Sequence, residues 1–361
     1  MSDAAAVSNA SPASDSAPQQ CDSADAPPVG SVAVGDCLEL MASWPAGCVD
    51  LVFADPPYNI GYGYDRYDDN RGDDEYVAWT EAWIDACARL LRPTGSMYVL
   101  IGDEYAAETR VHLKKLERDG RLAFRNWIVW HYTFGQNCKA KFNRSHAHLF
   151  YCVGSAALKK WKVSDPPFAF NREAIAVPSA RQTTYADARA NPKGKLPDDT
   201  WYLRPQDAQA DEQLAYFTPD EDTWYLSRLC GTFGERVGWH PCQLPEKLLE
   251  RIVRVSSNEN DVVFDPFVGS GTTLTVAALE GRRWLGCEMS EDYARNATER
   301  IVYAQTHGRS RRTTQQERGL DRQNPKKKRE PKRSPHLAGR RRQGEGGDEG
   351  APGGNDDTLF T

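Results

Sequence analysis

The chain has 361 residues, of which 27% are charged and 40% hydrophobic, and its formal net charge is −6. No apolar run approaches the roughly 20 residues that span a bilayer, and residues 1–29 lack the basic start and apolar core of a signal peptide. These features exclude a membrane-spanning protein and favour a soluble, cytoplasmic protein without a membrane partner.

The charge is distributed unevenly along the chain. Residues 309–342 contain 14 Lys and Arg against three acids, whereas residues 343–361 contain five acids and no Lys or Arg. The remaining chain is acidic, which is not typical of a protein that coats nucleic acid. Any nucleic-acid contact is therefore expected from a local patch or from the basic tail.

Nine cysteines are scattered through the sequence, and no two of them form a C-x-x-C pair. Their spacing indicates neither a zinc site nor a redox motif, so no metal is expected. Most are expected to be small buried side chains in a reducing compartment.

Both ends of the chain are expected to be disordered. Residues 1–30 consist mainly of Ala, Ser, Asp and Pro, and the apolar periodicity is lost again over residues 305–361. Such segments cannot bury enough apolar surface to offset the entropy of ordering them. The folded part is expected at residues 31–304, which is enough for one α/β domain with an insertion.

Residues 31–153 alternate between apolar runs and helical patterns. The run 48–54 is almost entirely apolar, as expected of a strand that is covered on both faces. It must end at Asp55, because the consecutive prolines Pro56 and Pro57 cannot continue a central strand. The same patterns predict further strands at 32–34, 97–101, 124–132 and 147–153, and helices at 38–44, 75–91 and 103–118.

Residues 155–235 are rich in Pro, Asp, Arg and aromatic residues and show no long periodic pattern. They contain a near-repeat, residues 199–203 and 222–226, which is too short for a solenoid. An irregular stretch of this length inside an α/β domain is usually functional or disordered. Its aromatic content argues against pure disorder.

Regular patterns return after residue 243. Ser290 is expected to cap the last helix, whose first turn carries Glu291 and Asp292. This alternation of strands and helices predicts an α/β fold with a mostly parallel sheet flanked by helices. The other expected elements are a helix that opens at Leu244-Pro245, strands at 262–264 and 284–288, and a helix at 274–279.

A glycine-containing segment, Asp-Pro-Phe-Val-Gly-Ser-Gly-Thr-Thr at 265–273, lies between a predicted strand and a predicted helix. Gly269 and Gly271 let the backbone approach a ligand closely, and the helix start offers free N–H groups. Glu288 ends the next strand, where a carboxylate can accept both hydroxyls of a ribose. Together these features indicate a nucleoside-binding site, although a Gly-x-Gly turn alone is as typical of a tight strand–helix connection.

A second motif, Asp55-Pro56-Pro57-Tyr58, follows the apolar strand. An exocyclic base amine is a poor nucleophile, and positive charge develops on its nitrogen during methylation. Asp55 and the Pro56 carbonyl can accept its N–H bonds, and the prolines hold these acceptors in place. Tyr58 offers a flat face for a base that is flipped out of a duplex.

These motifs together resemble the permuted beta group of DNA amino-methyltransferases, the family that methylates adenine N6 or cytosine N4. Asp55–Tyr58 matches the catalytic signature of this family, and 265–273 matches its cofactor loop, in the order typical of the beta group. His240-Pro241-Cys242-Gln243-Leu244-Pro245 resembles the family's His-Pro-Thr-Gln-Lys-Pro segment, with Cys and Leu as departures. The resemblance covers about residues 31–155 and 235–303.

The resemblance implies a Rossmann-like S-adenosylmethionine-dependent methyltransferase fold with circularly permuted motif order, in which residues 155–235 form an inserted target-recognition region. The catalytic residues are expected to be Asp55, Pro56, Pro57 and Tyr58. The residues expected to bind S-adenosyl-L-methionine are Asp36, Gln243, Asp265, Phe267, Gly269, Ser270, Gly271, Thr272 and Glu288. The residues expected to contact double-stranded DNA are Tyr62, Tyr64, Arg172, Arg181 and Arg204.

The leading hypothesis is site-specific methylation of adenine N6 in DNA by base flipping, in a nucleoid-associated cytoplasmic protein. Asp55 favours adenine, because cytosine-N4 members of the family more often carry Ser there, and cytosine remains the close alternative. RNA or glutamine methylation, a DNA-binding protein without catalysis and a Rossmann dehydrogenase fit the motifs less well. The loop at 61–74 is equally consistent with a lid and with a disordered acidic loop. A homodimer and a restriction-endonuclease partner stay open.

Overall fold

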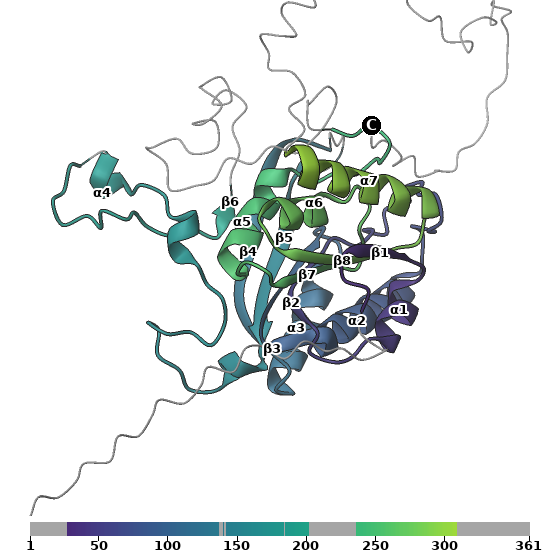
Figure 1. Cartoon of the computed structure of the whole chain (residues 1–361), viewed down its shortest axis with the longest axis horizontal. Coiled ribbons are helices and arrows are strands. Elements are labelled where there is room, and N and C mark those ends of the chain that lie inside the picture. Colours follow the sequence, from purple (N-terminus) through teal and green to yellow (C-terminus); the bar gives the residue numbers. More distant parts are fainter. Residues whose placement is uncertain (1–26, 137–139, 141, 184, 202–235, 309–361) are drawn as a thin grey trace, which may run out of the picture.

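One mixed β-sheet runs through the computed structural model, which describes residues 27–136, 140, 142–183, 185–201 and 236–308 (Figure 1). Its strand order is β1-β8-β7-β2-β3-β5-β4-β6. Among the described strands, only β5 runs against its neighbours, β3 and β4, and the other strand pairs are parallel. The strands are β1 Ser31–Val34, β2 Val49–Ala54, β3 Leu91–Ile101, β4 Leu122–Gln136, β5 Arg144–Gly154, β6 Thr200–Trp201, β7 Val262–Asp265 and β8 Arg283–Glu288.

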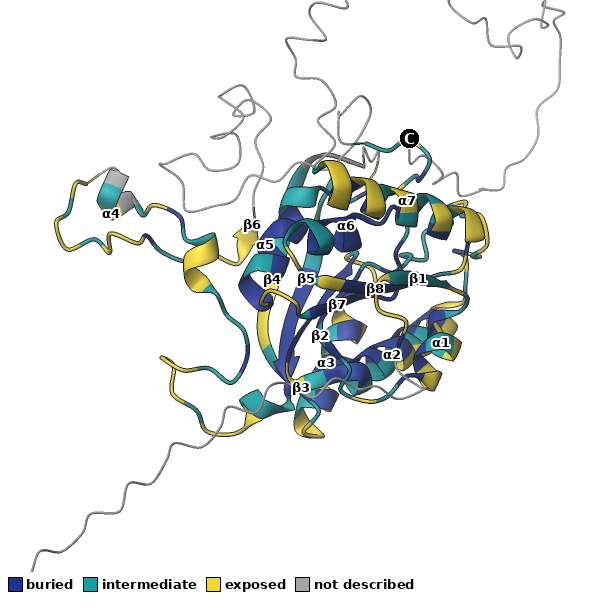
Figure 2. Cartoon of the chain, viewed as in Figure 1, coloured by how far each residue is buried: buried dark blue, intermediate teal, exposed yellow. Residues whose placement is uncertain are grey.

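Helices cover both faces of this sheet, so each face has its own buried core (Figure 2). One face packs against α5, α6 and α7, and the other packs against α1, α2 and α3. The expected α/β architecture, a mostly parallel sheet flanked by helices, is confirmed, and β5 is the reversed strand of this sheet. The α-helices are α1 Cys37–Ser43, α2 Asp73–Leu90, α3 Ala106–Arg118, α4 Ala180–Thr183, α5 Glu246–Ser256, α6 Thr272–Leu279 and α7 Glu291–His307.

Most local predictions are confirmed within a few residues. Strand β2 ends at Ala54, immediately before Asp55, as the two prolines require. Ser290 caps α7, since its hydroxyl accepts a hydrogen bond from the backbone N–H of Tyr293. Four of the six described cysteines are buried free thiols.

Several boundaries differ from the prediction, among them the end of β4 at Gln136 rather than 132 and the start of β5 at Arg144 rather than 147. Strand β3 begins at Leu91 rather than at 97, and the register between β2 and β3 shifts between the Leu91 and Ser96 pairs. Pro93 lies in this shifted stretch, and a proline has no N–H to donate to the ladder. Helix α7 continues to His307, three residues past the expected end of the folded part.

The insertion at 155–235 is described only up to residue 201, and the second copy of its near-repeat lies outside the described residues. The described part has short elements only, two 3₁₀ turns (Ser155–Leu158 and Arg172–Ile175), α4 and β6. Asn171 anchors it, since its side-chain amide donates to the carbonyls of Arg254 and Ser257 at the end of α5. The segment around α4 projects from the domain (Figure 1).

The described helices include none with the length and apolar composition that a bilayer span requires. Within the same residues, no group of three or more His, Cys, Asp or Glu side chains is arranged to hold a metal ion. The ends expected to be disordered were residues 1–30 and 305–361. Their outer parts, 1–26 and 309–361, lie outside the described residues, whereas residues 305–307 belong to α7 and Gly30 donates to the Trp284 carbonyl.

Candidate active site

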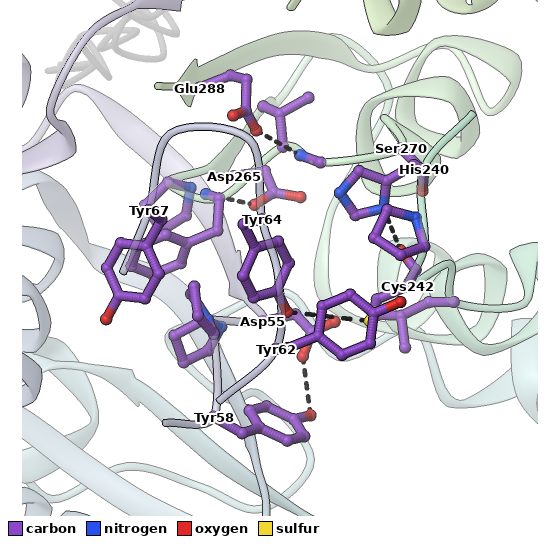
Figure 3. Close-up of a pocket in the computed structure, with 18 of the residues that line it drawn as sticks. Asp55, Tyr58, Tyr62, Tyr64, Tyr67, His240, Cys242, Asp265, Ser270 and Glu288 are labelled. Carbon is purple, nitrogen blue, oxygen red and sulfur yellow. Dashed lines mark hydrogen bonds between the residues drawn. The ribbon is translucent and has the colours of Figure 1, made fainter. Parts of the chain in front are cut away.

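Two motifs that are about 210 positions apart in sequence meet at one edge of the sheet. Asp55 follows β2 and Asp265 ends β7, and β2 and β7 are neighbouring parallel strands. Since the carboxyl ends of parallel strands lie at the same edge, both side chains face one cavity of about 260 Å³ (Figure 3). The predicted residues that line this cavity are Asp36, Asp55, Pro56, Pro57, Tyr58, Tyr62, Tyr64, Gln243, Asp265, Phe267, Gly269, Ser270, Thr272 and Glu288.

Residues 55–58, termed here the Asp55 loop, are held from within and from α2. The Tyr58 hydroxyl donates a hydrogen bond of 2.8 Å to the Asp55 carboxylate. From α2, the buried Tyr76 hydroxyl donates a bond of 2.6 Å to the Pro57 carbonyl. These two bonds define the orientation of the carboxylate and of the backbone that carries it.

The electrostatic environment raises the pKa of Asp55 to about 7. Burial is the main cause, and the negative charge of Asp265 adds to it, whereas the hydrogen bond from Tyr58 opposes the rise. The pKa of Asp265 is also raised to about 7, mainly by burial. Two carboxyl groups in this cavity therefore change protonation near neutral pH.

The loop at 61–72, termed here the crossing loop, is an ordered turn that arches over the cavity (Figure 3). The Ser290 hydroxyl, at the start of α7, donates 2.7 Å to the Asp65 carboxylate. Tyr64 points its hydroxyl at Cys242 Sγ, 3.9 Å away. The loop thus connects the half of the domain that carries the Asp55 loop to the half that carries β7 and β8.

The glycine loop, residues 265–273, depends on two glycines in the left-handed region, Gly269 at φ 49° and Gly271 at φ 76°. A Cβ at Gly269 would lie 3.0 Å from the ring of His240, and one at Gly271 would lie 2.9 Å from Cβ of Ala297 on α7. Any larger residue would therefore separate the loop from its supports. Gly271 does not line the cavity; its N–H donates to the Val268 carbonyl, and its carbonyl accepts from the N–H and the hydroxyl of Thr275.

Arg300 on α7 also holds the glycine loop. Its guanidinium donates to the Ser270 carbonyl at 2.9 Å, to the Thr272 hydroxyl at 3.1 Å and to Glu246 at 2.8 Å. With 14% of its side chain exposed, this cation is largely shielded from water. The loop geometry therefore depends on a helix that begins after the next strand.

Three carboxylates stand at the carboxyl ends of three adjacent strands, Asp36 after β1, Glu288 on β8 and Asp265 on β7. Asp36 accepts from the Leu38 N–H at 2.7 Å, and Glu288 accepts from the Gly269 and Ser290 N–H groups at 2.8 and 2.9 Å. Burial raises the pKa of Glu288.

These three carboxylates fit S-adenosylmethionine. Each carboxylate oxygen has further lone pairs, and the ligand presents two ribose hydroxyls, an adenine amine, an ammonium and a sulfonium, all of which are hydrogen-bond donors or cations. Its carboxylate can be met by the Ser270 and Thr272 hydroxyls, which line the cavity at the start of α6.

Two further predicted side chains have structural contacts at the cavity wall. The Gln243 side-chain carbonyl accepts from the Val237 N–H at 2.8 Å. The Phe267 ring packs against Trp79 and Trp83 of α2, with centroid distances of 5.6 and 5.2 Å.

Arg172 and Arg181, predicted to contact DNA, do not line the main cavity and are exposed on the insertion. Arg172 borders a second, smaller cavity of about 120 Å³ together with Lys193 and Lys195. Arg204 lies outside the described residues.

Four residues that shape the site were not predicted from the sequence: Asp69, Tyr76, His240 and Arg300. His240 had a partial signal, because it begins a segment that resembles a family motif. The other three lie in ordinary helical or loop sequence, and only their tertiary contacts identify them.

Comparison with known proteins shows the family of the chain. A family model described as DNA methylase, N6_N4_Mtase, matches residues 49–299. The chain belongs to this family. It is thus an S-adenosylmethionine-dependent DNA methyltransferase of the N6/N4 group, which confirms the family, the cofactor and the enzyme class expected from the sequence.

Relatives of this methyltransferase include two bacterial enzymes. It is 30% identical over 253 residues to Type II methyltransferase M.HpaI of Haemophilus parainfluenzae, which covers 70% of this chain and 68% of the relative. It is also 30% identical over 278 residues to DNA adenine methyltransferase YhdJ of Escherichia coli (strain K12), which covers 75% of this chain and 82% of the relative. Among solved structures, PvuII DNA methyltransferase (cytosine-N4-specific) aligns with a TM-score of 0.50 and 19% identity, over 81% of this chain and 90% of that one, which supports the fold.

Proposed function

We propose that this DNA methyltransferase methylates the exocyclic N6 amine of adenine in double-stranded DNA at a specific sequence. The observation that supports the proposal most strongly is the meeting of the Asp55 loop and the glycine loop on one cavity. The leading Asp55 favours adenine, and one relative, YhdJ, is named as a DNA adenine methyltransferase.

In this proposal the Asp55 carboxylate accepts an N–H of the flipped base, and the backbone carbonyl of Pro56 accepts the other. Bound S-adenosylmethionine supplies an electrophilic methyl group. Asp55 stabilises the positive charge that develops on the nitrogen, and it is a base to which the amine can release its proton. Only the ionised carboxylate can do this, so the raised pKa of Asp55 places the onset of activity near neutral pH.

We propose that the cofactor is held by the three strand-end carboxylates and the glycine loop. Glu288 takes the ribose hydroxyls, since its carboxylate is oriented by the Gly269 and Ser290 N–H groups. Asp36 lies at the cavity wall beyond it and takes the adenine side. Asp265, whose carboxylate also accepts from the Phe267 N–H at 2.9 Å, faces the cationic part.

We further propose that the insertion at 155–235 recognises the DNA sequence. Arg172 and Arg181 are exposed there and can reach phosphates or guanine edges. M.HpaI and M.BamHI of Bacillus amyloliquefaciens are both named Type II methyltransferases, which supports a role in a restriction–modification pair.

The deciding experiment is expression in a host that lacks DNA methylation, followed by sequencing of modified bases. N6-methyladenine at one recurrent sequence is expected. N4-methylcytosine instead would replace adenine by cytosine in the proposal, and DNA without modified bases would remove the proposal. Asp55→Ala is expected to abolish transfer while cofactor affinity stays within about threefold, and an active Asp55→Ala variant would exclude the role given to Asp55.

A further inference from the structure

We propose that Asp69 is a positioning residue for methyl transfer, acting through the backbone of the Asp55 loop. This inference rests on the proposed role of Asp55. Asp69 lies in the crossing loop, 14 positions after Asp55, and is only 2% exposed. It does not line the cavity, so its effect on a reacting base is indirect.

The Asp69 carboxylate is bonded to the backbone that leaves the Asp55 loop. Its Oδ1 accepts from the N–H of Asn59 at 2.8 Å, and its Oδ2 accepts from the N–H groups of Ile60 at 3.1 Å and Tyr62 at 2.9 Å. The Asp69 carbonyl accepts from the Gly61 N–H at 2.7 Å. One side chain thus binds three of the four backbone N–H groups that follow Tyr58.

Asn59 completes the arrangement from the other side. It has a left-handed backbone, φ 56°, which Asn tolerates better than most residues. Its side chain exchanges two hydrogen bonds with the backbone of Arg71, accepting from the N–H at 2.7 Å and donating to the carbonyl at 2.9 Å. It also donates to the Tyr105 hydroxyl at 2.9 Å, which in turn donates to Asp73 at the start of α2.

Together, Asn59 and Asp69 form a clasp that closes residues 59–71 into a turn with fixed ends. Tyr58 is adjacent to Asn59 in the chain, and its hydroxyl orients the Asp55 carboxylate at 2.8 Å. The clasp also holds together the two ends of the segment from which Tyr62 and Tyr64 line the cavity. A carboxylate is required at position 69, because both of its oxygens accept from backbone N–H groups. An amide offers only one acceptor oxygen, and its NH₂ group would face one of these backbone N–H donors.

The test compares Asp69→Asn with Asp68→Asn in the full-length protein. Asp68 is the adjacent carboxylate on the same loop and is exposed, so its variant makes the same change of charge and leaves the clasp intact. The measurements are the single-turnover rate of methyl transfer to genomic DNA from a methylation-free strain at saturating cofactor, and the equilibrium Kd for S-adenosylmethionine.

For Asp69→Asn we expect a rate about 10- to 100-fold lower, with the Kd changed less than about threefold, because a displacement near 1 Å at the reacting group costs about 10²-fold. Asp68→Asn is expected to match the wild type in both. Equal rates for Asp69→Asn and the wild type, equal losses in the two variants, or a loss confined to the Kd would each overturn the inference.

Asn59→Gly is the second variant, for the case in which Asp69→Asn does not fold. Glycine keeps the left-handed backbone and removes only the side-chain bonds to Arg71 and Tyr105. The same signature is expected, a lower rate with an unchanged Kd, and a wild-type rate would count against the clasp. A wild-type protein that transfers no methyl group, or an active Asp55→Ala variant, would instead refute the proposed function.

Discussion

Removing the hydroxyl of Tyr58 is expected to move the pH dependence of methylation. In the structure this hydroxyl donates 2.8 Å to Asp55, and the bond opposes the rise of the Asp55 pKa. Tyr58→Phe keeps the ring face for a flipped base but removes the donor. The carboxylate loses a stabilising partner, so the pKa of Asp55 must rise further.

The size of this shift follows from the strength of one bond. A hydrogen bond to a charged group contributes about 1.5–3 kcal/mol, and one pKa unit corresponds to about 1.4 kcal/mol. The pKa of Asp55 is therefore expected to rise from about 7 to about 8–9. Only the ionised form of Asp55 is active, so activity decreases when the pH falls below the pKa of Asp55. In Tyr58→Phe this decrease should therefore begin at a higher pH than in the wild type.

The assay is kcat/KM for S-adenosylmethionine between pH 5.5 and 10, which reports ionisations of the enzyme before the cofactor binds. Tyr58→Phe is expected to lose about 10- to 100-fold at pH 6 and to approach the wild type above pH 9. Tyr76→Phe is the matched control, because its hydroxyl bonds to the Pro57 carbonyl rather than to Asp55. It is expected to lower the rate without moving the inflection.

Two results would refute the reasoning. A Tyr58→Phe rate that is reduced equally at every pH would mean that the hydroxyl does not act on the ionisation of Asp55. An inflection that stays near 7 would assign it to Asp265, whose pKa is also raised to about 7.

Three further predictions concern the supports of the cofactor site. Arg300→Met is expected to destabilise the fold by about 1–3 kcal/mol, because it leaves buried acceptors without a donor. Calorimetry should also show cofactor binding weakened about tenfold. Arg295 lies on the same helix with 61% of its side chain exposed, so Arg295→Met should have neither effect. Gly271→Ala should lower the free energy of unfolding in urea by about 2–4 kcal/mol, because position 271 has a positive φ and an added Cβ would contact α7. An added Cβ at Gly63 has no atom within 4 Å, so Gly63→Ala should lower it by less than about 1 kcal/mol. The pKa of Asp265 is raised in the folded state, so the native protein binds this proton more tightly than the unfolded chain does. The free energy of unfolding of the wild type should therefore decrease as the pH rises from about 4 to about 7, by at most about 4 kcal/mol relative to Asp265→Asn. Parallel pH profiles of unfolding for these two proteins would contradict the last prediction.

Local sequence determined the elements and the two motifs. Alternating apolar runs and helical spacing predicted the strands and helices on either side of the insertion, because burial against a sheet imposes periodicity on each element separately. The two prolines after Asp55 determined the end of β2, since a residue without an N–H cannot continue a central strand. Ser290 was predicted as a cap because capping depends on neighbours within three residues.

The arrangement of the site was decided by the tertiary structure. The insertion shows no periodicity, so the contacts of Asn171 with α5 could not be predicted, and Arg172 and Arg181 proved to be outside the cavity. Asp69 and Arg300 looked like ordinary charged residues, because their partners are 7 to 54 positions away in the chain.

The length, charge pattern and motifs were sufficient to predict an α/β methyltransferase with Asp55 and Asp265 at strand ends. What they could not give is the pairing of β2 with β7, because the order of strands in a sheet depends on how distant segments pack together. That pairing brings Asp55 and Asp265 into one cavity, where burial raises the pKa of both carboxyl groups to about 7. Sequence determined the chemical groups of the site, and packing determined their protonation and orientation.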